Sequence, residues 1–284
     1  MCCLAVHFSR YIKQKLGADM NVKSILLYGP SGSGKTMLAQ AIAHHTGAMF
    51  LNISPSNLEK KFEGKTGPPK FVHMLMTVAR NANMAPVVIY MDEVERVFVK
   101  GKKKSTGPER FLKDLLDYKK RYLQPTDRVI FIGNTNKPHL MDEKIMKDVK
   151  IFWDKFLYVP WPGYASRHRI WTSLMEKALG GDILPDDLDV SSLARVSDGY
   201  TAGSIAYAIK KTLTQRRIEM MGLRELEETE FLNALSRCPR SKPEEEKFML
   251  AFTESCTNLK KRREALQRNK ADDSGKKSKG KKKK

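Results

Sequence analysis

The sequence predicts an α/β protein with a doubly wound parallel sheet, followed by a small α-helical lid domain and a disordered basic tail. Apolar, strand-like runs alternate with helical patterns up to about residue 162, and a glycine-rich loop joins the first run to the first helix. Beyond Gly163 the hydrophobic period is helical only. We therefore expect a lead-in over 1–21, an α/β unit over 22–162, a helical unit over 163–258 and the tail over 259–284.

The composition is that of a globular chain outside membranes. The 284 residues are 41% hydrophobic and 30% charged, and no apolar run approaches the length of a membrane span. The four cysteines form no C-x-x-C pair, and the N-terminus shows no signal peptide. We therefore expect a reducing compartment, the cytoplasm or cytoskeleton, with plain thiols at Cys2 and Cys3 in preference to acylated ones.

One loop fills every fixed position of the phosphate-binding pattern G-x-x-x-x-G-K-[ST]. The strand-like run Ser24–Tyr28 precedes it and a helical pattern follows it, which is the context that the pattern requires. Its glycines let the backbone turn tightly, so that successive N–H groups can converge on phosphate oxygens. Lys35 is expected to reach the β and γ phosphates, and the Thr36 hydroxyl to bind Mg²⁺.

A glycine-rich turn without a ligand would explain the glycines of this loop but not the Lys-Thr pair at its end. We therefore favour a nucleotide site. The predicted cofactor-binding residues are Gly29, Pro30, Ser31, Gly32, Ser33, Gly34, Lys35, Thr36, Met37 and Asp92.

Two carboxylates follow an apolar run of the kind that forms a central parallel strand. The run Val87–Met91 ends at Asp92 and Glu93, at the distance from the loop where a second nucleotide-binding element belongs. Parallel strands deliver the residues that follow them to the carboxyl edge of the sheet. Asp92 is therefore expected to hold Mg²⁺ together with Thr36, and Glu93 to polarise the attacking water.

A further apolar run over 128–133 ends at the polar residues 134–138, which should reach the same edge. Asn136 is the second predicted catalytic residue, because its amide could hydrogen-bond a γ-phosphate or orient the water. The structural alternative is an Asx turn that ends the strand. The remaining strands are expected over 48–53 and 156–162, the latter stopped by its prolines.

The helical unit shows no sign of a metal site, since no His/Cys spacing suggests zinc. Its first helix should bury Ile170, Trp171 and Leu174. Helices are expected over 165–178, 188–196, 205–221, 227–236 and 244–256.

Half of the net charge of the chain lies in its tail. Residues 259–284 contain thirteen Lys or Arg and three Asp or Glu, a net charge of +10 out of +20. Such a segment cannot bury enough apolar surface to fold alone. Binding to an acidic surface, such as nucleic acid or tubulin, is one interpretation, and a solvated tail or a localisation signal is the other.

Five stretches occur in the order and spacing of an AAA ATPase module, which the chain resembles over roughly residues 22–258. The resemblance implies a P-loop sheet of the AAA type with a helical lid, ATP and Mg²⁺ as cofactors, and hydrolysis of ATP to ADP and phosphate. The stretches resemble Walker A, Walker B, sensor 1, the strand leaving the large subdomain and the lid turn: Gly29–Thr36, Val88–Glu93, Gly133–Pro138, Tyr158–Pro162 and Gly199–Ile205.

Within that family the chain is most similar to the IQ-and-AAA-domain proteins of the nexin-dynein regulatory complex of motile cilia. The stretches 51–55, 164–167 and 196–201 and the lysine-rich end carry this likeness. It implies protein partners in an axonemal complex, a location in the axoneme of a cilium or flagellum, and microtubules as a surface for the tail. No IQ motif is visible, so we predict no calmodulin site.

Two departures from the family pattern argue against rapid hydrolysis and against threading of a polypeptide. Where AAA proteins of this type place two arginine fingers, this chain has Phe152 and Lys155. At the pore-loop position of unfoldases, aromatic-hydrophobic-Gly becomes Phe62-Glu63-Gly64. An acidic residue there weakens any grip on a threaded chain.

Three functions are therefore compared. We favour an ATP-binding subunit of an axonemal scaffold, with weak or partner-dependent ATP hydrolysis. The alternative is an active homo-oligomeric AAA ATPase that remodels proteins. A nucleic-acid motor rests on charge alone, and we do not expect nucleic acid as a partner.

Overall fold

The structure is a computed structural model that describes residues 22–58, 61–62, 64, 66–99, 107–124, 127–141, 145–181, 185, 188–257, 262–264 and 266. The predictions for the lead-in over 1–21 and for Glu63 lie outside these residues. Of the tail expected to be disordered, only 262–264 and 266 are described, and they are helical. Arg263 forms an ion pair with Glu254 at 2.7 Å, which links these residues to the preceding helix.

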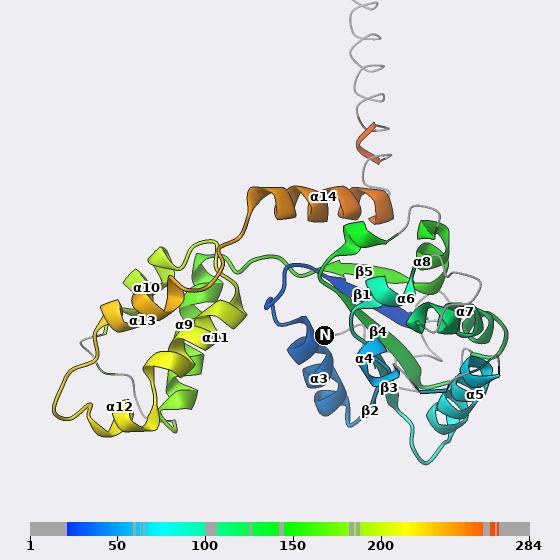
Figure 1. Cartoon of the computed structure of the whole chain (residues 1–284), viewed down its shortest axis with the longest axis horizontal. Coiled ribbons are helices and arrows are strands. Elements are labelled where there is room, and N and C mark those ends of the chain that lie inside the picture. Colours follow the sequence, from blue (N-terminus) through cyan, green and yellow to red (C-terminus); the bar gives the residue numbers. More distant parts are fainter. Residues whose placement is uncertain are drawn as a thin grey trace, which may run out of the picture.

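A five-stranded parallel sheet forms the centre of the α/β unit, which confirms the predicted fold class (Figure 1). The spatial order is β2-β3-β4-β1-β5. The last strand ends at Tyr158 instead of Pro162, because Val159 donates the last ladder bond, to Tyr28 O at 2.9 Å, and the prolines beyond it have no N–H. The strands are β1 (Ser24–Tyr28), β2 (Met49–Asn52), β3 (Val87–Met91), β4 (Val129–Thr135) and β5 (Lys155–Tyr158).

Helices cover both faces of this sheet. One core lies between the sheet and α3, and the other lies between the sheet and α5, α7 and α8. None of the described helices combines the length and the apolar character needed to cross a membrane. The helices of this unit are α3 (Lys35–Thr46), α4 (Pro55–Leu58), α5 (Gly67–Arg80), α6 (Val94–Val97), α7 (Phe111–Arg121) and α8 (Met146–Phe152), with 3₁₀ turns η2 (Pro108–Arg110) and η3 (Pro138–Leu140).

The central strands are buried on both faces, as expected for a parallel sheet between two helical layers. Successive residues alternate between the two cores. Val88, Tyr90 and Ile130 pack on the side of α3, whereas Ile89 and Phe131 belong to the opposite core.

The helices between Gly163 and Leu235 pack around a core of their own. Trp171 is completely buried, with its ring 5.6 Å from that of Phe231 and its indole N–H donated to Ser197 Oγ at 3.1 Å. The helix expected over 205–221 is two helices, because the chain is extended at Thr214. The lid helices are α9 (Tyr164–Ala178), α10 (Val190–Val196), α11 (Ala202–Thr212), α12 (Gln215–Glu219) and α13 (Glu228–Leu235).

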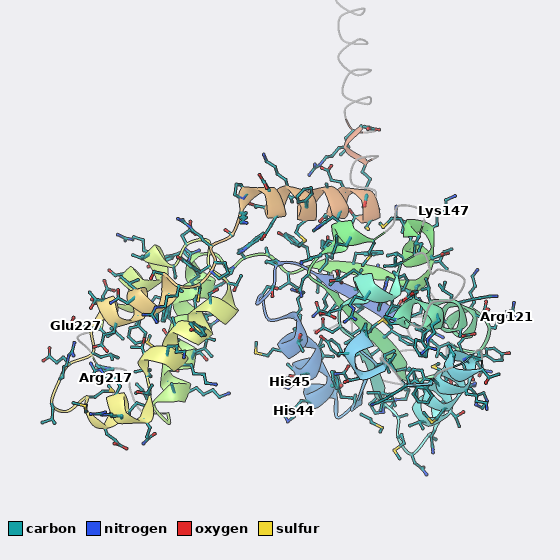
Figure 2. All side chains as sticks on the ribbon, viewed as in Figure 1. His44, His45, Arg121, Lys147, Arg217 and Glu227 are labelled. Carbon is teal, nitrogen blue, oxygen red and sulfur yellow. The ribbon has the colours of Figure 1, made fainter. Side chains whose placement is uncertain are left out.

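The far end of the lid is fixed by a charged pair. Arg217 donates to Glu230 Oε1 at 2.8 Å, and Figure 2 shows Arg217 and Glu227 at the end of the lid remote from the sheet. The hydrogen bond from Arg217 lowers the pKa of Glu230. This contact anchors the short helix α12 to α13.

The last long helix, α14 (Pro243–Thr257), packs on the α/β unit and not on the lid (Figure 1). Met249 and Phe252 are buried in the α/β core, and the ring of Phe252 lies 5.0 Å from that of Tyr28. The Tyr28 hydroxyl also hydrogen-bonds Thr253 Oγ1 at 2.7 Å. The predicted helical unit over 163–258 is therefore wrong for α14, because the period of a helix shows which residues are buried but not the core that buries them.

Candidate functional site

The carboxyl ends of three strands meet at one edge of the sheet. Because β4 lies between β1 and β3, the loop after β1 lies close to Asp92, which follows β3, and to Asn134, near the end of β4. The connections from β1 and from β4 leave toward opposite sides of the sheet. In open parallel sheets this is the usual position of a ligand.

The loop between β1 and α3 leads directly into the N-terminus of α3. Gly32 has a φ of 77°, and a Cβ on it would lie 2.7 Å from Thr201 Oγ1. Gly34 is the N-cap of α3 with a φ of 90° and offers no side-chain cap. The first N–H groups of α3 are therefore available to an anion.

Lys35 begins α3 and is 3% exposed. Its ammonium donates to Gly29 O at 3.0 Å and to Pro30 O at 2.6 Å. Burial lowers the pKa of Lys35 to about 8, while the nearby Asp92 carboxylate acts to raise that pKa. Because two neutral carbonyls compensate a buried cation less well than an anion does, the arrangement suits a phosphate group.

Thr36, Tyr90, Asp92 and Asn134 form a hydrogen-bonded polar cluster beside this lysine. The Tyr90 hydroxyl lies 3.0 Å from both Thr36 Oγ1 and Asp92 Oδ2. Asn134 Nδ2 donates to Asp92 Oδ1 at 2.8 Å and lies 3.2 Å from the Tyr90 hydroxyl. Burial raises the pKa of Tyr90 to about 12, so its hydroxyl is protonated at neutral pH.

Glu93 is adjacent to this cluster in sequence but has a different partner. It is the N-cap of α6, with a φ of 46° in the left-handed region. The Arg96 guanidinium donates to Glu93 Oε2 at 2.9 Å, and both side chains are about half exposed, at 43% and 47%. Asp92 belongs to the polar cluster, whereas Glu93, the next residue, belongs to the ion pair with Arg96.

A cavity of about 1020 Å³ lies between this edge of the sheet and the lid. It brings together most of the predicted loop residues with Asp92 and Asn136, but Gly29, Pro30, Ser33 and Glu93 are not among the described residues that line it. From the α/β unit it is lined by Ser31, Gly32, Gly34, Lys35, Thr36, Met37, Asp92, Asn134 and Asn136. From the lid it is lined by Arg169, Ile170, Ser173, Leu174, Lys177, Ala202, Gly203 and Ala206.

The lid touches the loop directly at the start of α11. Gly203 N–H donates to Gly32 O at 2.8 Å, and a Cβ on Gly203 would lie 3.1 Å from Cα of Gly32. Thr201 caps α11 by accepting a hydrogen bond from Ser204 N–H at 3.3 Å. This glycine-to-glycine contact closes one wall of the cavity.

Residues that could hold a metal are few in this part of the chain. The described residues contain no group of three or more His, Cys, Asp or Glu side chains that could hold a metal ion. His44 and His45 lie at the end of α3 remote from the loop (Figure 2). A divalent cation at the polar cluster would have Thr36 and Asp92 as protein ligands and would share the remaining positions with phosphates and water, which is how Mg²⁺ is usually held.

Comparison with known proteins agrees with this geometry. Residues 25–155 match the family described as ATPase family associated with various cellular activities (AAA), and this range contains the loop, Asp92 and Asn136. The chain contains an AAA ATPase domain. It is 36% identical to the mouse protein Dynein regulatory complex protein 11 over 274 residues, which are 93% of this chain and 31% of that protein.

Other relatives of this AAA domain are spastins. The spastin of Drosophila virilis is 31% identical over 79% of this chain and 30% of its own length, and that of Danio rerio is 29% identical over 79% and 40%. The chain thus spans about a third of the length of the curated relatives it matches. Among solved structures, the crystal structure of the FIGL-1 AAA domain has a TM-score of 0.69 at 25% identity, over 88% of this chain and 83% of that one.

One expectation drawn from the family pattern is wrong for this AAA domain. Phe152 ends α8 with 0% exposure, and its ring packs 5.3 Å from Phe131 and 4.8 Å from Trp153. A side chain at this position cannot reach a neighbouring subunit, so Phe152 does not occupy the place of an arginine finger. Ile151, the preceding residue of α8, is 48% exposed, and Lys155 is exposed at the start of β5.

Sequence reasoning missed four contributors to the cavity and its polar cluster. Tyr90 lies inside an apolar run, and Asn134 belongs to the polar residues expected at the sheet edge, but the sequence pattern assigns neither a role. Ile170 and Leu174 pack against the lid core as expected, but both are only partly buried and also line the cavity. A polar side chain within an otherwise apolar strand, one or two residues before the carboxyl edge, is the signal that could have indicated Tyr90 and Asn134.

Proposed function

We propose that this AAA domain binds Mg-ATP in the cavity and hydrolyses it slowly, as a nucleotide-binding subunit of an axonemal assembly. The observation that carries the proposal is the convergence of Lys35, Thr36 and Asp92 on the wall of one cavity, beside the N-terminus of α3. The FIGL-1 AAA domain has been crystallised in complex with ADP, and that structure is 25% identical to this chain with a TM-score of 0.60.

Each predicted residue has a role in this proposal. Lys35 and the N–H groups of the loop bind the phosphates, and Thr36 and Asp92 hold Mg²⁺. The bound Mg²⁺ would neutralise negative charge on the phosphate oxygens. Asn136 lines the cavity and hydrogen-bonds the γ-phosphate, and Glu93 orients the attacking water.

The adenine has a place on the lid side of the same cavity. Ile170 and Leu174 of α9 supply apolar surface there, while Arg169 and Lys177 add positive charge to the wall. Ligand sites of this kind combine apolar walls with a few polar groups that fix orientation. The lid thus contributes the part of the nucleotide site that the phosphate loop lacks.

Hydrolysis is expected to be slow for two reasons. The first is the ion pair between Glu93 and Arg96, which has to break before Glu93 can orient the water. Because an exposed ion pair is worth at most about 1 kcal/mol, it slows hydrolysis only a few-fold. The larger effect is the missing guanidinium, which in related phosphate-loop enzymes contributes about 10³ to 10⁵ in rate. Ile151 and Lys155, the exposed side chains of this segment, carry no guanidinium, and a lysine lacks the planar fork of arginine.

Single-turnover hydrolysis of ATP by the full chain tests this proposal. We expect binding followed by turnover at roughly 10⁻⁴ to 10⁻² per second, the range of a finger-less phosphate-loop protein. Quenched-flow sampling with excess protein gives the rate of the chemical step separately from product release. A rate of order ten per second for the chain alone would contradict the proposed slow hydrolysis.

An active threading motor is less well supported than a scaffold subunit. The ring of Phe62, at the pore-loop position, packs 4.8 Å from that of Phe71 and is partly buried against the α/β core. A side chain held in this way is poorly available to a threaded polypeptide. For a nucleic-acid motor we find no support beyond the positive charge.

The axonemal part of the proposal rests on the likeness to Dynein regulatory complex protein 11 and on the basic tail. We expect protein partners in the axoneme of a cilium or flagellum, and residues 259–284, with their net charge of +10, to bind acidic surfaces such as microtubules.

Cosedimentation with microtubules tests the tail. The full chain should pellet with microtubules at low salt and be released as salt rises, because screening weakens exposed charges. A variant that ends at residue 258 should remain in the supernatant under both conditions. Equal pelleting of the two proteins at low salt would refute a role for the tail.

A further inference from the structure

We infer that Tyr90 and Asn134 are positioning residues for the metal: from inside the sheet they hold Thr36 and Asp92 in the arrangement that binds Mg²⁺. The inference rests on the proposed function, since it concerns the metal of the Mg-ATP site. It assigns a role to two side chains that neither the phosphate-loop pattern nor the Asp-Glu pair includes.

The Tyr90 hydroxyl has two oxygen neighbours. This hydroxyl lies 3.0 Å from Thr36 Oγ1 and 3.0 Å from Asp92 Oδ2, but it has only one proton to donate. The Asp92 side chain offers acceptor oxygens, whereas Thr36 has a hydroxyl proton of its own, so Tyr90 donates to Asp92 and accepts from Thr36. With its proton committed to Tyr90, Thr36 Oγ1 presents its lone pairs to a cation.

The other oxygen of Asp92 accepts two further hydrogen bonds. Asn134 Nδ2 donates to Asp92 Oδ1 at 2.8 Å, and Glu93 N–H donates to the same oxygen at 2.9 Å. Together with Tyr90 on Oδ2, these bonds fix both oxygens of the carboxylate. An anion that is already oriented loses less conformational freedom when it binds a metal or a metal-bound water.

Both positioning groups are held rigidly. Tyr90 is 1% exposed in the central strand β3, and its ring is stacked on that of Phe50 at a centroid distance of 5.2 Å. Asn134 is 3% exposed in β4. The positions of both groups are thus determined by the sheet and not by the loop.

Asn134 also has an unused acceptor. Its Oδ1 is buried and has no hydrogen-bond partner among the described residues. Buried acceptors without a partner are rare, and such an atom next to a metal site is suited to accept a hydrogen bond from a water of the metal shell.

The experiment compares nucleotide affinity with and without the metal. A fluorescent ATP analogue is titrated into the full chain in EDTA and at a series of Mg²⁺ concentrations. For Tyr90→Phe we expect the Mg²⁺ concentration of half-maximal effect to rise roughly tenfold, because one hydrogen bond to a charged group is lost. Affinity in EDTA should stay within about twofold of the wild type, since Lys35 and the loop N–H groups are unchanged.

Tyr158→Phe is the matched control. Tyr158 lies in β5 of the same sheet, and its hydroxyl is buried without a hydrogen-bond partner among the described residues. Removal of that hydroxyl should leave the dependence on Mg²⁺ unchanged. Asn134→Ser, which shortens the donor so that it no longer reaches Asp92, should shift the dependence in the same direction as Tyr90→Phe.

The outcomes separate the inference from the proposed function. If Tyr90→Phe is folded and its Mg²⁺ dependence equals that of the wild type, or if affinity falls equally in EDTA and in Mg²⁺, the positioning role is refuted while ATP binding stands. If Tyr90→Phe does not fold, Asn134→Ser decides by the same comparison. If the wild type binds no nucleotide in either condition, the proposed function fails and the inference fails with it.

Discussion

Lys35→Ala is expected to weaken binding of Mg-ATP by roughly 10- to 100-fold, the loss that removal of a charge-assisted hydrogen bond produces. The Lys35 ammonium is buried, and its hydrogen-bond partners among the described residues are Gly29 O, Pro30 O and the hydroxyl of Ser33. A phosphate would replace these neutral partners with an anion, so the lysine contributes more to the bound state than to the free one.

Calorimetry on the two proteins measures this difference. Lys210→Ala is the control, because Lys210 is an exposed residue of α11 that does not line the cavity. It should bind Mg-ATP like the wild type. Equal affinities for Lys35→Ala and the wild type would show that the phosphates do not lie on this loop.

Glu93→Gln is expected to reduce single-turnover hydrolysis by about 10² or more and to leave ATP affinity unchanged. The amide has the shape of the carboxylate and its oxygen can still accept from Arg96, but it cannot take up the proton of the attacking water. The change therefore removes the general base without disturbing the N-cap of α6.

Glu176→Gln, an exposed position of α9, is the matched control for loss of one negative charge near the lid. Its hydrolysis rate should equal that of the wild type. Unchanged hydrolysis in Glu93→Gln would mean that another group orients the water, and a parallel loss of affinity would mean that Glu93 acts in binding.

The sheet and the phosphate loop could be predicted because local sequence determines them. Gly32 and Gly34 adopt positive φ values that other residues rarely adopt, so the glycine pattern itself indicates the backbone conformation of the loop. The strand Val87–Met91 has the predicted bounds. Its unbroken apolar run is buried on both faces of the sheet, and the strand ends where the run ends.

The contacts between distant elements could not be predicted in this way. Phe152 and the residues of α14 carry the pattern of buried helix positions, but only the assembled fold shows that both pack in the α/β core. Tyr90 and Asn134 become neighbours because β3 pairs with β4, and Ile170 reaches the cavity because α9 forms part of its lid wall. Strand pairing and helix packing determine these contacts, and the local sequence pattern predicts neither.

The central claim is that ATP binds between the phosphate loop and the lid, and a calorimetric titration of the full wild-type chain with ATP in the presence of Mg²⁺ tests it most directly. We predict one ATP bound per chain, displaced by ADP and strengthened by Mg²⁺. A folded chain that shows no saturable binding at millimolar ATP would contradict the claim.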